Sequence, residues 1–106
     1  MNTIAQGLMK AGVLAEITVL RIQVEDKLRS CRGIGEFWRL VQDILVNHPV
    51  LAPSVYRTAS SLWYTKDKTM VNSLKILKNS LKEVPEGKQS KFVQDFFMNT
   101  GRYTAR

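Results

Sequence analysis

The chain has 106 residues, a length that accommodates about one domain. Hydrophobic residues make up 44% of it and charged residues 24%, a balance that excludes a chain disordered throughout. Sixteen lysines and arginines against nine acidic residues give a net charge of +7, which favours a polyanionic partner such as a nucleic acid.

A single cysteine and a single histidine limit the chemistry of the chain. Cys31 has no partner for an internal disulfide, and Cys31 and His48 alone cannot form a zinc site. The sequence contains no phosphate-binding loop, nucleophile elbow or zinc-protease motif. We therefore expect a protein that is not an enzyme, needs no metal or cofactor, and occupies a reducing intracellular compartment.

Neither a secretory signal nor a membrane span is expected. The longest uncharged stretch, residues 44–56, has 13 residues and contains two prolines. A spanning helix needs about 20 apolar residues.

Residues 3 to about 32 predict one long helix. Thr3 and Gln6 form a capping box at its start. Apolar residues follow at helical intervals, namely Ile4, Leu8, Val13, Ile17, Leu20, Val24 and Leu28. Gly33 is typical of the residue that ends a helix. A helix roughly 40 Å long is large for a lone domain of this size, so it indicates a hairpin or a bundle.

A second helical stretch, from about Gly35 to Thr65, contains two prolines. Its apolar residues keep helical intervals: Phe37, Val41, Ile44, Leu51, Val55, Ala59 and Leu62. Pro49 and Pro53 each remove a backbone donor and crowd the carbonyl four residues earlier, so a kink or a break is expected. The pattern fits either one bent helix or two helices joined near residues 48–53.

Two further helices follow. Asp67 is the predicted N-cap of a third helix, which ends before the segment Val84-Pro85-Glu86-Gly87. Residues 90–99 predict a short fourth helix. Because no alternating strand pattern competes, the chain is predicted to be all-α. We expect a helical domain over residues 1–85, and a short C-terminal helix and tail over residues 86–106.

The positive charge is concentrated between residues 44 and 82, where six cationic residues accompany one acid, Asp67. The lysines of the third helix are typical of a solvated face that keeps a small protein soluble. The second helical stretch contains a more specific pattern, which is the spacing of its two arginines. On an unbroken helix, Arg39 and Arg57 lie five turns and about 27 Å apart on one face. That distance approximates one turn of an A-form duplex.

The same face carries small polar side chains that would let a phosphate backbone approach closely. We expect it to bind duplex RNA through phosphates and 2′-hydroxyls without reading the base sequence. The residues predicted to bind RNA are Arg39, Asn47, Ser54, Arg57, Ser61 and Lys66. The alternative is an ordinary polar outer face.

The segment Tyr56-Arg57-Thr58-Ala59-Ser60-Ser61-Leu62, followed by Lys66, resembles the double-stranded-RNA-binding suppressors of RNA silencing of insect nodaviruses. In that family an arginine is followed by a Ser-Leu pair and then a lysine. A second arginine lies 18 residues upstream, where this chain has Arg39. The matched region covers about a quarter of the chain. Val50 stands where the family has a lysine, and both prolines fall inside the matched helix.

The resemblance implies a helical hairpin with long antiparallel helices that dimerises into a four-helix bundle, plus short C-terminal helices. It assigns RNA binding and dimerisation to the helical domain over residues 1–85. It also implies binding of long duplex RNA and small interfering duplexes in the host-cell cytoplasm, which would shield them from the RNA-interference machinery. The segment with Phe92, Phe96 and Phe97 would then either cap the bundle or bind a host protein such as the dicing enzyme.

Two other classes of function remain open. One is a sequence-specific DNA-binding regulator built on the second and third helices. The other is a helical protein-interaction adaptor whose lysines serve only solubility. Preference for one DNA sequence would favour the first, and salt-insensitive capture of a protein partner would favour the second.

Overall fold

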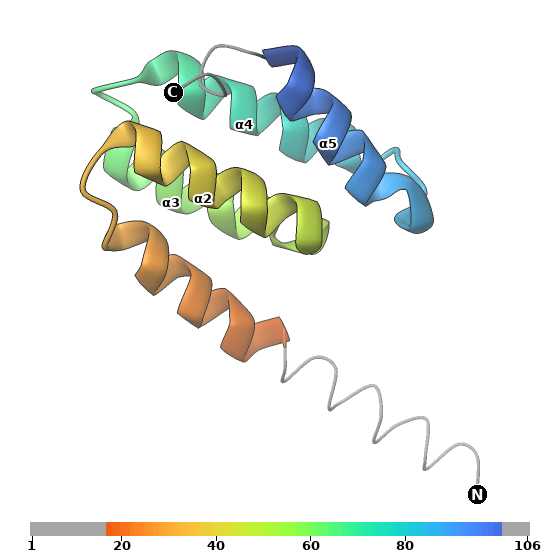
Figure 1. Ribbon diagram of the computed structural model, residues 1–106, viewed down its shortest axis with the longest axis horizontal. Coiled ribbons are helices and arrows are strands. Elements are labelled where there is room, and N and C mark those ends of the chain that lie inside the picture. The colour runs from red at the N-terminus through yellow and green to blue at the C-terminus, as the bar shows by residue number, and fades with distance from the viewer. Residues whose placement is uncertain (1–16, 101–106) are drawn as a thin grey trace, which may run out of the picture.

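The computed structural model describes residues 17–100, and their regular structure is entirely helical (Figure 1). Residues 17–29 form the N-terminal helical segment. It is followed by α2 (Ile34–Asn47), the 3-10 turn η1 (Pro49–Leu51), α3 (Ala52–Trp63), α4 (Lys68–Leu81), the 3-10 turn η2 (Glu86–Lys88) and α5 (Gln89–Thr100). The prediction of an all-α chain is confirmed for this part of the sequence.

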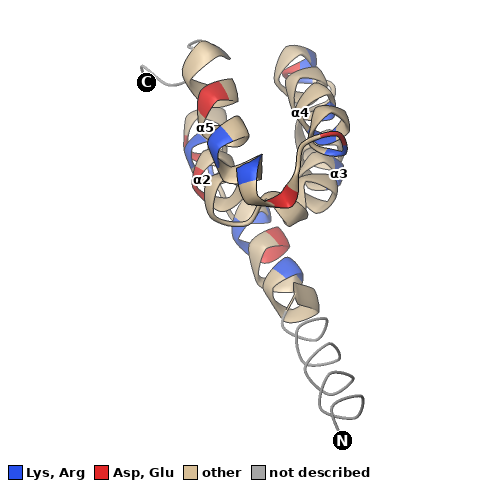
Figure 2. Ribbon diagram, turned by 90° about the vertical axis from the view of Figure 1, so that its right-hand side faces the viewer, with Lys and Arg blue, Asp and Glu red and all other residues tan. Residues whose placement is uncertain are grey.

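Helices α2 to α5 form two layers, with α2 and α5 in one and α3 and α4 in the other (Figure 2). The two helices of each layer run in opposite directions (Figure 1). Trp38 near the start of α2 contacts Phe97 near the end of α5, with ring centroids 5.2 Å apart. Phe37 of α2 and Trp63 of α3, with centroids 5.7 Å apart, join the two layers.

The hydrophobic core draws residues from all four of these helices. Its largest members, Trp38 and Phe37, are fully buried, and the same core contains smaller apolar side chains: Val41, Leu45, Leu51, Val55, Met70, Leu74, Leu77, Leu81 and Val93. Helix α5 lies beyond residue 85, where a separate C-terminal segment is predicted, yet it packs into the same core through Val93 and Phe97. Phe92 and Phe96 are only half-buried against it.

The second predicted helical stretch is two helices, which decides between the alternatives that the sequence leaves open. Helix α2 ends at Asn47, and His48 leaves the helical conformation with φ −138° and ψ 70°, as a residue before proline tends to do. Pro49 opens η1, and Pro53 lies in the first turn of α3, where its missing N–H costs little. The chain reverses here. The long helical hairpin implied by the resemblance is therefore not the architecture of residues 17–100.

The helix caps agree with the sequence at one site and differ at another. Asp67 caps α4 as predicted, because its side chain accepts a hydrogen bond from the Met70 amide at 3.0 Å. Gly33 does not end the preceding helix: the N-terminal helical segment ends at residue 29, and Gly33 is instead the N-cap of α2, with φ −147° and ψ 169°. The predicted capping box of Thr3 and Gln6 lies outside the described residues.

The N-terminal helical segment adds Val24 and Leu28 to the core and exposes Val19 and Ile22 to solvent. Neither it nor any other helix within residues 17–100 has the length and apolar character needed to cross a membrane.

Candidate nucleic-acid interface

The net positive charge of the described residues lies in one helical hairpin. Residues 52–82, which comprise α3, α4 and their connection, carry six lysines and arginines and one acid. The rest of residues 17–100 carries seven lysines and arginines and seven acids, so its formal charges cancel. The hairpin therefore holds a net charge of +5 while the remainder of residues 17–100 is formally neutral, and the hairpin forms one of the two layers (Figure 2).

Four lysines form a row along one side of α4, the last of which, Lys82, directly follows the helix as its C-cap. Lys68, Lys75, Lys78 and Lys82 follow one another at intervals of seven, three and four residues. These intervals return to the same side of an α-helix, because each is close to a whole number of turns. At 1.5 Å per residue the row extends about 21 Å. The buried leucines Leu74, Leu77 and Leu81 hold the helix on the core.

This row lies on the side of α4 that adjoins α3. The Nζ atom of Lys78 is 4.7 Å from the ring centroid of Tyr56, and the Nζ atom of Lys68 is 5.5 Å from that of Tyr64. Tyr56 belongs to α3 and Tyr64 follows directly after it. The lysines are therefore aligned along the solvent-facing junction of the two helices.

Two more cations flank the row. Arg57 is exposed on α3, next to Tyr56, and Lys66 is exposed in the turn that leads to α4. Together with the four lysines of α4 they define what we call the basic strip: Arg57, Lys66, Lys68, Lys75, Lys78 and Lys82. The single acid of the hairpin, Asp67, is engaged as the N-cap of α4.

Three of the six predicted RNA-binding residues lie on or beside the basic strip. Arg57 and Lys66 are members of it, and Ser61 is exposed on α3 one turn after Arg57. Ser54 is different because only 5% of its surface is exposed. Its hydroxyl oxygen accepts a hydrogen bond from the Arg57 guanidinium at 3.4 Å, so Ser54 supports the arginine and does not present its hydroxyl to a ligand.

The two remaining predicted residues lie on α2, in the other layer. Arg39 is exposed but has an acid one turn away on either side, Glu36 and Asp43. Asn47 donates a hydrogen bond from its amide to the Asp43 carbonyl oxygen at 2.8 Å. Arg39 and Arg57 share a face only if α2 and α3 form one unbroken helix. Because the chain reverses between α2 and α3, the two arginines do not share one.

The four lysines of the row are not among the residues that the sequence predicts to bind RNA. Their spacing is visible in the sequence, but a lysine-rich helix face is common on soluble proteins. The informative observation is the contact of Lys78 with Tyr56, which joins residues 22 positions apart.

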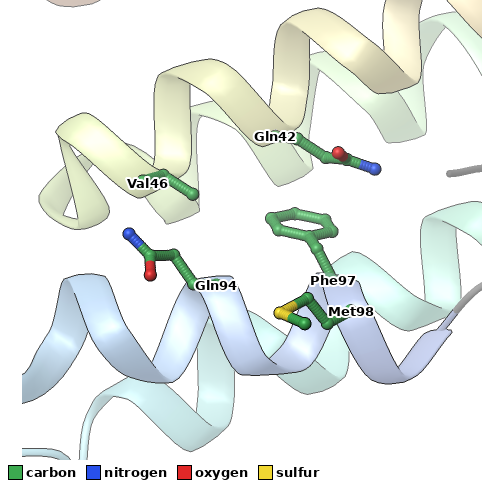
Figure 3. Close-up of a pocket in the computed structure, with 5 residues that line it drawn as sticks. All are labelled: Gln42, Val46, Gln94, Phe97 and Met98. Carbon is green, nitrogen blue, oxygen red and sulfur yellow. The ribbon is translucent and has the colours of Figure 1, made fainter.

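A separate groove of about 480 Å³ lies between α2 and α5 (Figure 3). Gln42 and Val46 line it from α2, and Gln94, Phe97 and Met98 line it from α5. Met98 is 77% exposed. None of these five side chains ionises near neutral pH. The groove can accept an apolar side chain between two amides, and its lining has no group suited to acid–base chemistry.

Within residues 17–100, no three His, Cys, Asp or Glu side chains gather in a way that could hold a metal ion. Comparison with protein-family models, with curated proteins and with solved structures found no match to this chain.

Proposed function

We propose that this protein binds double-stranded RNA without sequence preference through the basic strip. The observation that carries the proposal is the confinement of the net positive charge to the α3–α4 hairpin, with four lysines in one row. A phosphate backbone is a regular line of negative charge, and its neutralisation by lysine and arginine is the main sequence-independent source of affinity for nucleic acids. A row about 21 Å long can contact several phosphates at once.

The composition of the basic strip favours contact with the backbone over base readout. Five of its six residues are lysines, which act as point charges toward phosphates. Bidentate recognition of bases relies instead on arginine, asparagine and glutamine on a helix that enters the major groove. The deep, narrow major groove of A-form RNA excludes such a helix, so duplex RNA is bound mainly through its shape and backbone.

The choice of RNA over DNA rests on the resemblance of residues 56–66 to nodavirus silencing suppressors. We extend the proposal accordingly: by coating long duplex RNA and small interfering duplexes in the host-cell cytoplasm, the protein would keep them from the RNA-interference machinery. This role requires no enzymatic activity, metal or cofactor.

A pair of charge-matched variants tests the proposal. Lys75→Gln/Lys82→Gln removes two charges from the basic strip, and Lys88→Gln/Lys91→Gln removes two from η2 and α5. We expect the first variant to bind duplex RNA about tenfold more weakly and the second to stay within about twofold of the wild type. The same loss in both would show that net charge matters and the strip does not.

The protein-interaction adaptor remains the second candidate, favoured by the groove between α2 and α5 and by the exposed Met98. Salt-insensitive capture of a protein partner, lost in Met98→Lys and with no retention of nucleic acid, would support it. The DNA-binding regulator would be supported by tighter binding to one DNA sequence than to random duplex RNA.

The homodimer implied by the resemblance stays a prediction. Because one chain already buries Trp38, Phe37 and Phe97, we expect the monomer to fold and a dimer to bury surface outside this core. Sedimentation equilibrium over a range of protein concentrations measures which species is present.

A further inference from the structure

Three aromatic residues at the junction of α3 and α4 each hold a lysine over the ring. Lys78 lies 4.7 Å from the centroid of Tyr56, Lys68 lies 5.5 Å from that of Tyr64, and Lys66 lies 5.5 Å from that of Trp63. These distances fall within the range of attraction between an ammonium group and the face of an aromatic ring, which is about 6 Å. Three of the six residues of the basic strip thus have their ammonium groups over an aromatic ring.

The rings are themselves held by the protein to different degrees. Tyr56 and Trp63 are half-buried and pack against the core, and the rings of Trp63 and Phe37 pack edge to face with centroids 5.7 Å apart. Tyr64 is more open, with 47% of its surface exposed. A free lysine side chain has many rotamers, and its ordering on binding costs conformational entropy. A lysine seated on a fixed ring has already lost part of this freedom.

We infer, on the basis of the proposed RNA binding, that Tyr56, Trp63 and Tyr64 are positioning residues that fix the lysines for the regular phosphate spacing of a duplex. The same placement of the lysines over the rings favours the binding of duplex RNA over single-stranded RNA. Proteins that bind single strands stack bases on open aromatic faces and track a flexible backbone. In the basic strip each of the three rings has a lysine over one face, so the aromatic surface available to unpaired bases is reduced.

In the part of the chain that the structure describes, the basic strip contains both lysines that lie over an aromatic ring and lysines that do not, so the two kinds can be compared. Lys75 and Lys82 belong to the same row, and among residues 17–100 no ring is seen to seat either of them. Their charges should strengthen binding to any RNA. The seated lysines should contribute most to a ligand with fixed phosphate spacing.

The test measures affinity for a duplex RNA of about 25 base pairs and for one of its strands alone. The variants are Tyr56→Phe, which keeps the ring, and Tyr56→Leu and Tyr64→Leu, which keep apolar bulk without a ring. We expect Tyr56→Phe to match the wild type. Each leucine variant should lose about three- to tenfold in duplex affinity and little in single-strand affinity, so the ratio of the two falls at least threefold.

Two controls separate positioning from general damage to the fold. Lys75→Gln should weaken both ligands by a similar factor and leave their ratio unchanged. If Tyr56 acts through Lys78, the double variant Tyr56→Leu/Lys78→Met should bind duplex no more weakly than Lys78→Met alone. Thermal unfolding establishes that each variant is folded. If Tyr56→Leu does not fold, Tyr64→Leu still tests the inference, because Tyr64 is exposed.

The outcomes for the inference and for the proposed function differ. If folded leucine variants keep the wild-type ratio of duplex to single-strand affinity, the positioning role is wrong while RNA binding by the basic strip stands. If the wild-type protein does not bind duplex RNA at all, the proposed function fails, and the inference fails with it.

Discussion

The ammonium group of Lys78 on α4 lies 4.7 Å from the centroid of the Tyr56 ring on α3, so this pair bridges the two helices of the hairpin at its charged surface. Tyr56 is half-buried and packs against the core, and its ring also contacts the lysine. The pair therefore ties the position of a surface charge to the packing of the interior. This coupling is the structural reason to treat Lys78 as a positioned charge and not as a free surface lysine.

The two arginines singled out from the sequence should contribute unequally to binding. Arg57→Gln removes a member of the basic strip, and we expect about a fivefold loss of duplex affinity, equivalent to roughly 1 kcal/mol. Arg39→Gln should change affinity less than about twofold, because Arg39 lies between Glu36 and Asp43 in the other layer. Gel-shift titration measures both. A larger loss for Arg39→Gln would contradict the assigned surface.

Replacement of Asp67 should separate its role in folding from its charge. Asn serves as well as Asp at an N-cap, so Asp67→Asn should preserve stability while removing the single acid of the hairpin. We expect about a two- to threefold gain in duplex affinity. Asp67→Ala should instead cost about 1 kcal/mol in the free energy of unfolding. Urea denaturation and gel-shift titration of the two variants measure these effects, and equal stability of both would argue against the cap.

The contact of Trp38 with Phe97 should make α5 part of one cooperative unit. Phe97 is 3% exposed, so Phe97→Ala should lower the free energy of unfolding by about 3–5 kcal/mol. Phe92, which is half-buried on the same helix, serves as the control, and its replacement by alanine should cost clearly less. Equal effects, or two unfolding transitions, would show that α5 does not share the core.

Cys31 should react slowly with alkylating reagents near neutral pH. Burial raises the pKa of its thiol above the ordinary value, and the negative charge of Glu36 adds to this effect. The thiolate is the reactive form, so a raised pKa means less of it at a given pH. The rate of modification by iodoacetamide should be lower than for a free cysteine and should still be rising with pH where that of free cysteine levels off. A rate equal to that of free cysteine would contradict the assignment.

Local signals in the sequence predicted much of the secondary structure. The N-cap at Asp67, the end of α4 before Pro85 and the helix over residues 90–99 each depend on neighbouring residues, and the structure confirms them. The break at Pro49 depends on more than proline chemistry, because a proline can kink a helix without ending it. The reversal is favoured by tertiary packing, because Leu51 and Ala52, which follow Pro49, are buried in the core.

The site was harder to predict than the helices because it spans two of them. The helical register places Arg57 on the exposed polar face, as the structure does, but it also places Ser54 there, which the structure buries. Within α3 alone, Ser54 lies one turn before the buried Thr58, whose hydroxyl donates to the Ser54 carbonyl oxygen at 3.0 Å. Helical periodicity assigns a residue to a face of its own helix, and only tertiary packing shows which faces meet.

The most direct test of the central claim is a gel-shift titration of the wild-type protein with duplex RNA of about 25 base pairs, matched duplex DNA and single-stranded RNA, at about 50 and 200 mM salt. Duplex RNA should bind most tightly, and its affinity should fall by up to about 1,000-fold between the two salt concentrations if all six cations of the basic strip contact phosphates. Equal binding of the three ligands, or an affinity that does not depend on salt, would contradict the assignment of the basic strip as a duplex-RNA-binding surface.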